Sequence, residues 1–555
     1  MTDNWKRSVR TMRTKEKHMK KTKYLAACVA AVMALLVMGC KSGDDDEHGI
    51  DYDAEKWVIA DTTLVRYTGA EEDVRIPDGV TVIGESAFKY RGGVVTSVTL
   101  PESVKIIEDS AFSGCARLAE VKMPAGLAML KAGAFDGCKS LASVEIPASV
   151  KSIGNYAFSG CTSLASVEIP ASVKSIGERA FSGCTSLASV TIPDGVESIG
   201  KSAFENCKSL ASVEIGDGVE SIGESAFENC KSLASVEIGD GVESIGESAF
   251  YGCTSLASVE IPGSVKSIGK DAFYQCWSLT DVKYGGTLAQ WCQMDNDSNL
   301  VEYATSIKLS DGSDLKSLEE LKIPSDVTKI GANAFYKCKS LASVKIPGSV
   351  KSIGSSAFSG CGSLAVTYGG TLSQWCQMDN DGSLVVYATS IKLSDVTDLK
   401  SLTTLKIPSD VTKIGERAFY QCKSLESVEI PGSVKSIGEY AFFYCTSLAS
   451  VTIGDGVESI GDSAFSRCDS LESVEIPGSV KSIENYAFSD CKSLASVTIP
   501  ASVTSIGGYA FRNCTSLAEV KYGGTAEQWK RIDIGSNAFP STAKIYDKED
   551  NEIKK

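Results

Sequence analysis

Apolar residues recur along this chain at a regular spacing, and the dipeptide Ala-Phe marks each recurrence. The first interval is one position longer than the others, after which the spacing stays at 23, and it returns to 23 after two interruptions. The Phe residues of the series are Phe88, Phe112, Phe135, Phe158, Phe181, Phe204, Phe227, Phe250, Phe273, Phe335, Phe358, Phe419, Phe442, Phe465, Phe488 and Phe511. A fixed period of this length indicates stacked units, each too small to form a core of its own.

One unit illustrates the expected local structure. Residues 141–146 predict a short strand in which Val144 points inward and Glu145 outward, because side chains alternate along a strand. Pro147 ends this strand, and we expect Gly154 to occupy a turn with positive φ. The fold class is therefore a repeat solenoid with a 23-residue period, a leucine-rich-repeat, horseshoe-like array of short parallel strands, turns and short helical segments.

Three segments with the sequence Tyr-Gly-Gly-Thr-x-x-Gln-Trp interrupt the rhythm, and they end at Trp291, Trp375 and Trp529. Each lengthens the step between strand centres by two positions, and a much shorter unit follows the first two, at Ile307 to Leu321 and at Ile391 to Leu405. Because solenoid ends need covering units, we interpret each segment as a cap-like coil and infer three fused arrays. Their boundaries are 56–304 for the first array with an N-terminal cap and a cap-like coil, 305–390 for a short second array with a cap-like coil, and 391–555 for a third array with the C-terminal cap.

The N-terminal region has the features of a bacterial export signal. Residues 19–38 are a basic stretch followed by an apolar one that is too short to span a bilayer comfortably. A small residue and Cys40 follow, which resembles a lipobox. We expect residues 1–39 to be a signal peptide whose true start is Met19, Cys40 to be lipidated, and residues 40–55 to form an acidic, solvated tether. An ordinary signal with a chance cysteine is the alternative.

Charge and histidine content argue against two function classes. The formal net charge of -15 is unfavourable for a nucleic-acid partner, since such affinity depends on cations that neutralise phosphates. The chain has two histidines, His18 and His48, and both precede the repeats. We therefore expect no enzyme activity, no catalytic residues and no cofactor.

The repeats resemble a known family. The consensus Ser-Leu-x-x-Val-x-Ile-Pro-x-x-Val-x-x-Ile-Gly-x-x-Ala-Phe-x-x-Cys is similar to the BspA-like leucine-rich-repeat family, and the match covers most of the chain from about Thr62 onward. The resemblance implies a bacterial surface protein, and it implies that host matrix proteins or other bacteria are its partners.

Cysteine occupies one position of the repeat. The chain has 19 cysteines, and 15 of them, from Cys115 to Cys514, form this column. Disulfides are common in exported proteins, but an odd-numbered column cannot pair completely, so we expect buried free thiols, with disulfides between coils as the alternative. One ligand per coil also disfavours tetrahedral zinc, and we expect no metal site.

The outward strand positions of the first array form an acidic column. The candidate binding face consists of Glu145, Glu168, Glu214, Glu237 and Glu260, with Thr191 between the second and third. Stacked strands lie about 4.8 Å apart, so neighbouring carboxylates repel one another mildly. The column either engages a basic partner or only keeps the face solvated, and the sequence leaves both readings open.

Two short segments carry part of a calcium-loop pattern. Residues 294–298 and 378–382 each place two aspartates at alternate positions, but a full loop needs a third ligand and a later glutamate. We expect ordinary Asn/Asp turns there.

The function that the sequence favours is an adhesin-like binding protein, displayed on the outer surface of the cell envelope and held to the membrane by the lipid on Cys40. Many similar coils allow weak contacts to add through multivalency. A non-catalytic spacer or structural protein of the envelope is the alternative, and no nucleic acid is expected as a partner.

Overall fold

The computed structural model describes residues 56–553 except 90, 297–299 and 381–382. Each regular unit forms one coil with two strands, followed by a series of turns that carries the Ala-Phe dipeptide. In the unit considered above, β9 (Ser143–Glu145) is followed by β10 (Ser152–Ile153). Val144 and Phe158 are buried, whereas Glu145 is exposed, as the alternation of apolar and polar residues predicts.

The coils stack in parallel, so that equivalent residues of successive repeats lie opposite each other. Ser152 of β10 pairs with Ser175 of β12 (Ser175–Ile176), and Ser166 of β11 (Ser166–Glu168) pairs with Ser143 of β9. The stacking creates two columns of strands. The predicted repeat solenoid is confirmed.

The inner column consists of two-residue strands, most of them with the sequence Ser-Ile. Its members are β4 (Val82–Ile83), β6 (Ile106–Ile107), β8 (Met129–Leu130), β10, β12 (Ser175–Ile176), β14 (Ser198–Ile199), β16 (Ser221–Ile222), β18 (Ser244–Ile245), β20 (Ser267–Ile268), β22 (Asp295–Asn296), β25 (Lys329–Ile330), β27 (Ser352–Ile353), β29 (Asp379–Asn380), β32 (Lys413–Ile414), β34 (Ser436–Ile437), β36 (Ser459–Ile460), β38 (Ser482–Ile483), β40 (Ser505–Ile506) and β42 (Asp533–Ile534). Hydrogen bonding divides them into a sheet that ends at β22, a sheet of β25, β27 and β29, and a sheet from β32 to β42.

The outer column consists of strands of three to five residues that come from the Val-x-Ile part of the repeat. Its members are β3 (Asp73–Arg75), β5 (Ser97–Thr99), β7 (Glu120–Lys122), β9, β11 (Ser166–Glu168), β13 (Ser189–Ile192), β15 (Ser212–Ile215), β17 (Ser235–Ile238), β19 (Ser258–Ile261), β21 (Asp281–Tyr284), β23 (Ser306–Lys308), β24 (Glu320–Lys322), β26 (Ser343–Ile346), β28 (Leu364–Tyr368), β30 (Ala388–Lys392), β31 (Thr404–Lys406), β33 (Ser427–Ile430), β35 (Ser450–Ile453), β37 (Ser473–Glu475), β39 (Ser496–Ile499), β41 (Glu519–Tyr522) and β43 (Lys544–Tyr546).

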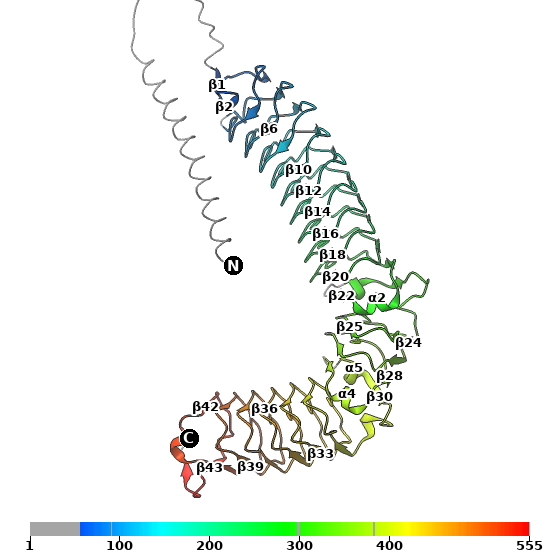
Figure 1. The fold of residues 1–555 in the computed structure, drawn as a ribbon, viewed down its shortest axis with the longest axis vertical. Coiled ribbons are helices and arrows are strands. Elements are labelled where there is room, and N and C mark those ends of the chain that lie inside the picture. Colours follow the sequence, from blue (N-terminus) through cyan, green and yellow to red (C-terminus); the bar gives the residue numbers. More distant parts are fainter. Residues whose placement is uncertain (1–55, 90, 297–299, 381–382, 554–555) are drawn as a thin grey trace, which may run out of the picture.

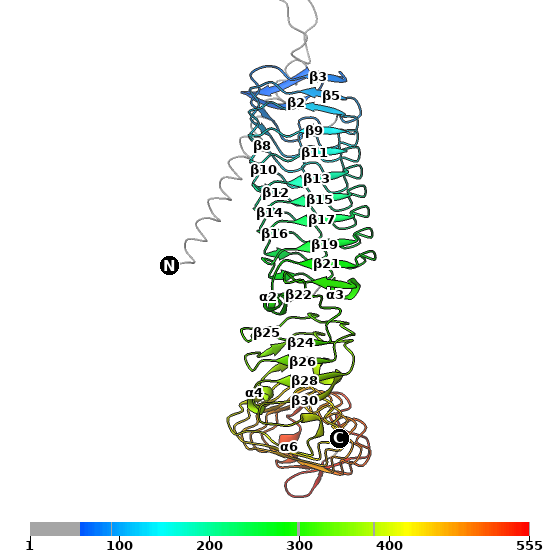
Figure 2. The same cartoon turned by 90° about the vertical axis from the view of Figure 1, so that its right-hand side faces the viewer.

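The stack of coils bends in its middle part. Figure 1 shows the labelled strands β10 to β22, β36 and β42 on the inner side of the bend, and β24, β33 and β39 on its outer side. The view in Figure 2 is turned towards the outer column, whose strands from β9 to β21 form a continuous row. The outer column is therefore the convex face of the molecule.

Aromatic rings form the centre of the core. From Phe88 to Phe273 each Phe ring stacks on the next, with ring centroids 4.6 to 5.4 Å apart. A second stack joins Phe335 and Phe358, and a third begins at Phe419. Burial of one large ring in each regular coil supplies apolar contact along each stack.

Short helices occur where the Phe stacks stop. They are α2 (Leu288–Gln293), α3 (Leu300–Tyr303), α4 (Leu372–Cys376), α5 (Ser383–Tyr387), η2 (Leu399–Ser401) and α6 (Ala526–Trp529). A capping box formed by Thr and Gln begins α2, α4 and α6, which explains the repeated Thr-x-x-Gln of these segments. In the first two, Trp291 and Trp375 are buried and donate from the indole nitrogen to the carbonyl oxygens of Ala334 and Ala418, each at 2.9 Å.

Antiparallel pairs stand at both described ends of the solenoid. β1 (Trp57–Ala60) pairs with β2 (Thr63–Tyr67), and β43 pairs with β44 (Glu552–Ile553). The other strand pairs of the described residues are parallel. The reversed strands cover edges that would otherwise be free to pair with another chain.

The expectation for Gly154 is wrong. The positive φ values of this coil belong to Tyr156 (58°) and Gly160 (67°). Gly154 is needed for close approach instead, because a Cβ there would lie 2.5 Å from the carbonyl carbon of Lys131 in the preceding coil. Glycine is therefore required here by the close approach of two coils and not by a positive φ.

Candidate binding surface

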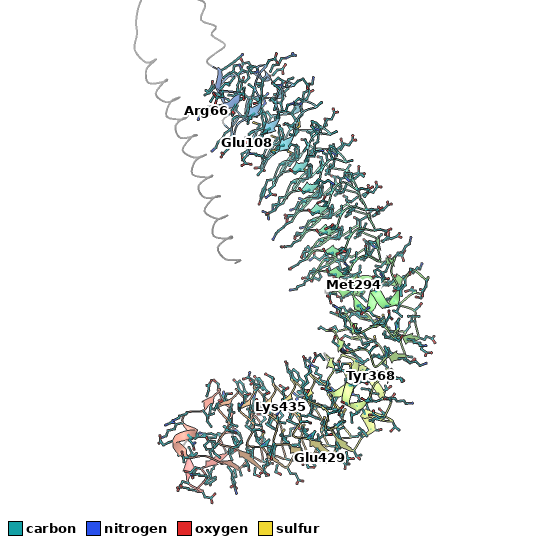
Figure 3. All side chains as sticks on the ribbon, viewed as in Figure 1. Arg66, Glu108, Met294, Tyr368, Glu429 and Lys435 are labelled. Carbon is teal, nitrogen blue, oxygen red and sulfur yellow. The ribbon has the colours of Figure 1, made fainter. Side chains whose placement is uncertain are left out.

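The predicted glutamates lie on outer-column strands, and their side chains are exposed. Glu145 of β9 lies opposite Glu168 of β11. On β15, β17 and β19 the aligned residues are Glu214, Glu237 and Glu260. Thr191 of β13 separates these two groups within one continuous row of stacked strands. Figure 3 shows Glu429, at the equivalent position of a later coil, on the outer side of the bend.

Of Glu214, Glu237 and Glu260, the first and the last each contact a neighbouring side chain. The Thr191 hydroxyl donates to Glu214 at 3.4 Å, and the Lys283 ammonium lies 3.7 Å from a Glu260 carboxylate oxygen. More than half of each side chain in the Lys283–Glu260 pair is exposed, so the pair contributes little to stability. Glu237 forms no salt bridge with any described residue. The negative charge of the column therefore remains available to a partner.

A groove of about 600 Å³ borders Glu214 and Glu237, and the sequence analysis did not find it. Most of its lining comes from one position of three successive coils, residues 191–195, 214–217 and 237–240. Neighbouring glycines let these coils approach closely: a Cβ on Gly218 would lie 1.8 Å from the carbonyl oxygen of Asp194, and a Cβ on Gly241 equally close to that of Asp217. Glycine is thus required at this point of the groove.

The groove is acidic on both sides. Asp194 accepts a hydrogen bond from the backbone nitrogen of Asp217, and Asp217 accepts one from that of Asp240, each at 2.9 Å. These aspartates therefore hold successive coils together as well as adding charge. The signal that would have revealed them is the sequence Ile-Gly-Asp-Gly-Val, which replaces Ile-Pro-x-x-Val in two of these coils.

The cysteine column has a structural role. Every cysteine of the described region is buried and free. The Cys207 thiol donates to the carbonyl oxygen of Phe181 at 3.2 Å, and Cys230 makes the same contact with Phe204. Burial raises the pKa of both thiols well above its ordinary value. The prediction of free core thiols is confirmed, and such thiols are inert rather than nucleophilic.

The calcium-like segments form strands. Asp295 and Asn296 make up β22, where Asn296 takes the inward position that Ile268 holds in the preceding coil, so the turn expected at these residues is wrong. Asp379 and Asn380 do the same in β29. Asp295 pairs with Lys329 at 2.5 Å and Asp379 with Lys413 at 2.8 Å. Among the residues that the structure describes, no group of three or more His, Cys, Asp or Glu side chains is placed to hold a metal ion.

The remaining predicted features lie in the N-terminal region. The signal peptide at 1–39, the lipidation site Cys40 and the tether at 40–55 fall outside the described residues. In the part of the chain that is described, none of the helices has the length and apolar character needed to cross a bilayer.

Comparison with known proteins identifies the repeat. The family described as "BspA type Leucine rich repeat region (6 copies)" matches residues 81–210, 174–294, 305–373 and 389–518. No curated protein sequence matches.

Solved structures of bacterial repeat proteins are similar to this chain. A leucine-rich repeat protein from Bacteroides ovatus is 25% identical over 88% of this chain and 94% of its own, with a TM-score of 0.32. A leucine rich cell surface protein from Faecalibacterium prausnitzii is 25% identical over 89% and 99%, with a TM-score of 0.25. A leucine rich repeat protein of T. pallidum is 29% identical over 41% and 89%, with a TM-score of 0.28. Since the family match extends over more than half of the residues, this chain belongs to the BspA-type leucine-rich-repeat family.

Proposed function

We propose that this protein is displayed on the bacterial surface and binds other proteins or cells through its outer column. The observation that carries the proposal is the in-register row of exposed carboxylates at Glu214, Glu237 and Glu260 beside the acidic groove. Because a carboxylate recurs on successive strands, the row fits an extended partner with basic side chains. Several weak contacts along the row then add to a higher affinity. Host matrix proteins and proteins of other cells are the partner classes.

The test compares two faces of the same three coils. One variant carries Glu214→Gln, Glu237→Gln and Glu260→Gln on the outer column. The control variant carries Glu197→Gln, Glu220→Gln and Glu243→Gln, which removes the same charge beside the inner strands β14, β16 and β18. Full-length protein in detergent is titrated against immobilised host matrix proteins and intact cells at several salt concentrations.

If the outer column contacts the partner, the first variant should bind more weakly. Its binding should also depend less on salt, because it lacks the ion pairs that salt screens in the wild type. The control variant should bind like the wild type. Equal weakening in both variants would instead indicate a general effect of net charge, and unchanged binding in the outer variant would contradict the proposal.

Display on the surface requires anchoring. In this proposal Cys40 carries the lipid, the preceding residues are the export signal, and the acidic tether separates the solenoid from the membrane. Incorporation of a labelled fatty acid into the wild type but not into a Cys40→Ser variant tests the anchor. Loss of the repeats when intact cells are treated with protease tests exposure, and full protection would contradict it.

A spacer function is the second candidate, and the continuous Phe stack from Phe88 to Phe273 favours it, because one unbroken core joins these coils into an extended body. A spacer predicts no saturable binding and a cellular phenotype that depends on the number of coils. Saturable binding that the outer-column variant weakens would exclude a purely structural role.

A further inference from the structure

The last coil is built differently from the coils before it. Phe511 precedes the strand residue Val520 by nine positions, but Phe539 precedes Ile545 of β43 by only six. Phe539 still stacks on Phe511 at 5.1 Å, and the Phe511 nitrogen donates to the carbonyl oxygen of Ala538 at 2.7 Å. The beginning of the coil is therefore regular, and the missing residues belong to the turn that normally holds the cysteine and leucine of the repeat.

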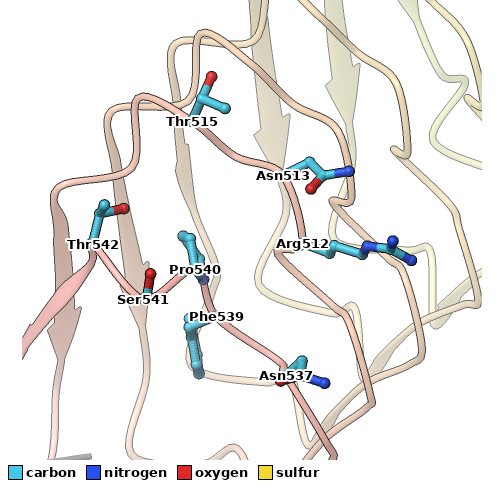
Figure 4. Close-up of a pocket in the computed structure, with 8 residues that line it drawn as sticks. All are labelled: Arg512, Asn513, Thr515, Asn537, Phe539, Pro540, Ser541 and Thr542. Atoms are coloured by element: carbon cyan, nitrogen blue, oxygen red, sulfur yellow. The ribbon is translucent and has the colours of Figure 1, made fainter.

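This shortening opens a pocket of about 380 Å³ against the preceding coil. Figure 4 shows its two sides: Arg512, Asn513 and Thr515 lie along one segment, and residues 537–542 run along the other. The volume lies within the range of about 300–1,000 Å³ that is usual for small-ligand sites.

The lining combines polar and apolar side chains and carries no carboxylate, although the protein has a net charge of -15. Hydroxyl and amide groups come from Asn513, Thr515, Asn537, Ser541 and Thr542. The Asn513 amide nitrogen donates to Asp490 at 3.0 Å, which fixes the orientation of that side chain. Apolar surface comes from Phe539 and Pro540, which are only partly buried.

Arg512 supplies a cation at the rim. Its guanidinium lies over the Tyr509 ring, 5.2 Å from the centroid, and it forms no salt bridge with a carboxylate of the described residues. An unpaired guanidinium presents a planar fork of donors that fits a carboxylate. Figure 4 shows this side chain extending away from Phe539, so the two residues would contact different parts of a ligand.

We propose that this terminal pocket binds a sugar unit that carries a carboxylate. Hydroxyl and amide groups pair with the sugar hydroxyls, Phe539 and Pro540 contact the apolar face of the ring, and Arg512 pairs with the carboxylate. The site lies in the last coil, far along the chain from the glutamate column, and it does not depend on the function proposed for that column.

The experiment uses full-length protein in detergent with glucuronic acid and glucose as probes, followed by saturation-transfer NMR and calorimetry. The two sugars differ in the carboxylate, so glucose should bind about tenfold more weakly, the effect of losing one hydrogen bond to a charged group. Arg512→Gln should lower the affinity for glucuronic acid to that for glucose and leave the affinity for glucose unchanged. Thr515→Val keeps the side-chain shape but removes the hydroxyl, so it should weaken the binding of both sugars.

Two controls keep the result interpretable. Arg467→Gln removes an exposed guanidinium that lies over Tyr444 in an earlier coil, 5.9 Å from its centroid and outside the pocket, and it should change neither affinity. Thermal unfolding of each variant checks that the solenoid is intact. Absence of saturable binding by folded wild-type protein would overturn the proposal, as would equal affinity for the two sugars or binding that Arg512→Gln and Thr515→Val leave unchanged.

Discussion

The indole nitrogen of Trp291 donates to the carbonyl oxygen of Ala334 at 2.9 Å, and this contact replaces a backbone hydrogen bond of the regular stack. In regular coils the Phe nitrogen of one coil donates to the Ala carbonyl of the next, as Phe112 does to Ala134 at 2.8 Å. Ala334 begins a new Phe stack and has no such Phe in front of it. The Trp side chain therefore completes the coil ladder where the repeat is interrupted.

A lysine satisfies a second carbonyl at the same interruption. The Lys316 ammonium donates to the carbonyl oxygens of Val301 at 2.6 Å and Tyr336 at 2.9 Å. Lys400 repeats the second contact with Tyr420 at 3.4 Å. Burial lowers the pKa of both lysines. The first two Trp segments thus connect successive Phe stacks, whereas Trp529 packs against Phe539 of its own coil, with centroids 5.9 Å apart.

The first prediction concerns this connection. Trp291→Phe removes the donor and leaves the buried Ala334 carbonyl unsatisfied, which costs about 1–3 kcal/mol in addition to the loss of packing. Thermal unfolding should occur at lower temperature, and limited proteolysis should cut first between residues 305 and 334. The matched control is Trp529→Phe, which removes packing but no hydrogen bond to a following array. Equal destabilisation by both variants would show that the indole nitrogen contributes nothing.

The second prediction concerns the tight coils beside the acidic groove. Gly218→Ala places a Cβ 1.8 Å from a backbone oxygen, so the coils must separate, at a cost of about 1–3 kcal/mol or more. The variant should unfold at a lower temperature than the wild type.

Gly478→Ala is the control for this substitution, because a Cβ there meets no atom within 4 Å. It should be neutral or stabilise the protein by up to about 1 kcal/mol through the lower entropy of its unfolded chain. Similar melting temperatures for Gly218→Ala and the wild type would mean that the groove is wider in solution.

The period of the repeat was enough to predict the stacked fold, because apolar positions that recur at a fixed interval must share one core. The inward positions of Val144 and Phe158 and the free thiols of the cysteine column follow from the same repetition. The connection from Trp291 to Ala334 does not, since it joins a side chain to a carbonyl in a later array and depends on how the coils are offset.

The candidate surface was predictable only in part. Alternation along the strand places Glu214 and Glu237 on the outside, but the groove beside them depends on how closely Gly218 brings two backbones together. A turn was expected at Asp295 because Asp and Asn favour turns, yet hydrogen bonding to β20 imposes a strand. The terminal pocket results from a shorter segment after Phe539, a change that is visible in the sequence only once the register of the last coil is known.

The third prediction is a loss of stability in alkaline solution. Burial raises the pKa of the column thiols, for example of Cys207, Cys230 and Cys253, well above the ordinary value of 9.0. Below pH 9 these thiols are protonated in both the folded and the unfolded chain, so they cause no pH dependence. Above pH 9 only the unfolded chain ionises, and each thiol then lowers the free energy of unfolding by up to about 1.4 kcal/mol per pH unit. Lys316 and Lys400 act in the opposite direction because their pKa is lowered, but two lysines oppose a much longer column of thiols.

Melting temperatures between pH 7.5 and 10.5 test this prediction, and they should fall increasingly steeply once the pH exceeds 9. The informative variant replaces Cys207, Cys230 and Cys253 by Ser, because a hydroxyl can still donate to the carbonyl oxygens of Phe181, Phe204 and Phe227 but does not ionise in this range. Its free energy of unfolding should depend less on pH, by up to about 4 kcal/mol per pH unit above pH 9. A wild-type melting temperature that stays constant up to pH 10.5, or a pH dependence that the three serines leave unchanged, would mean that these thiols reach solvent in the folded protein.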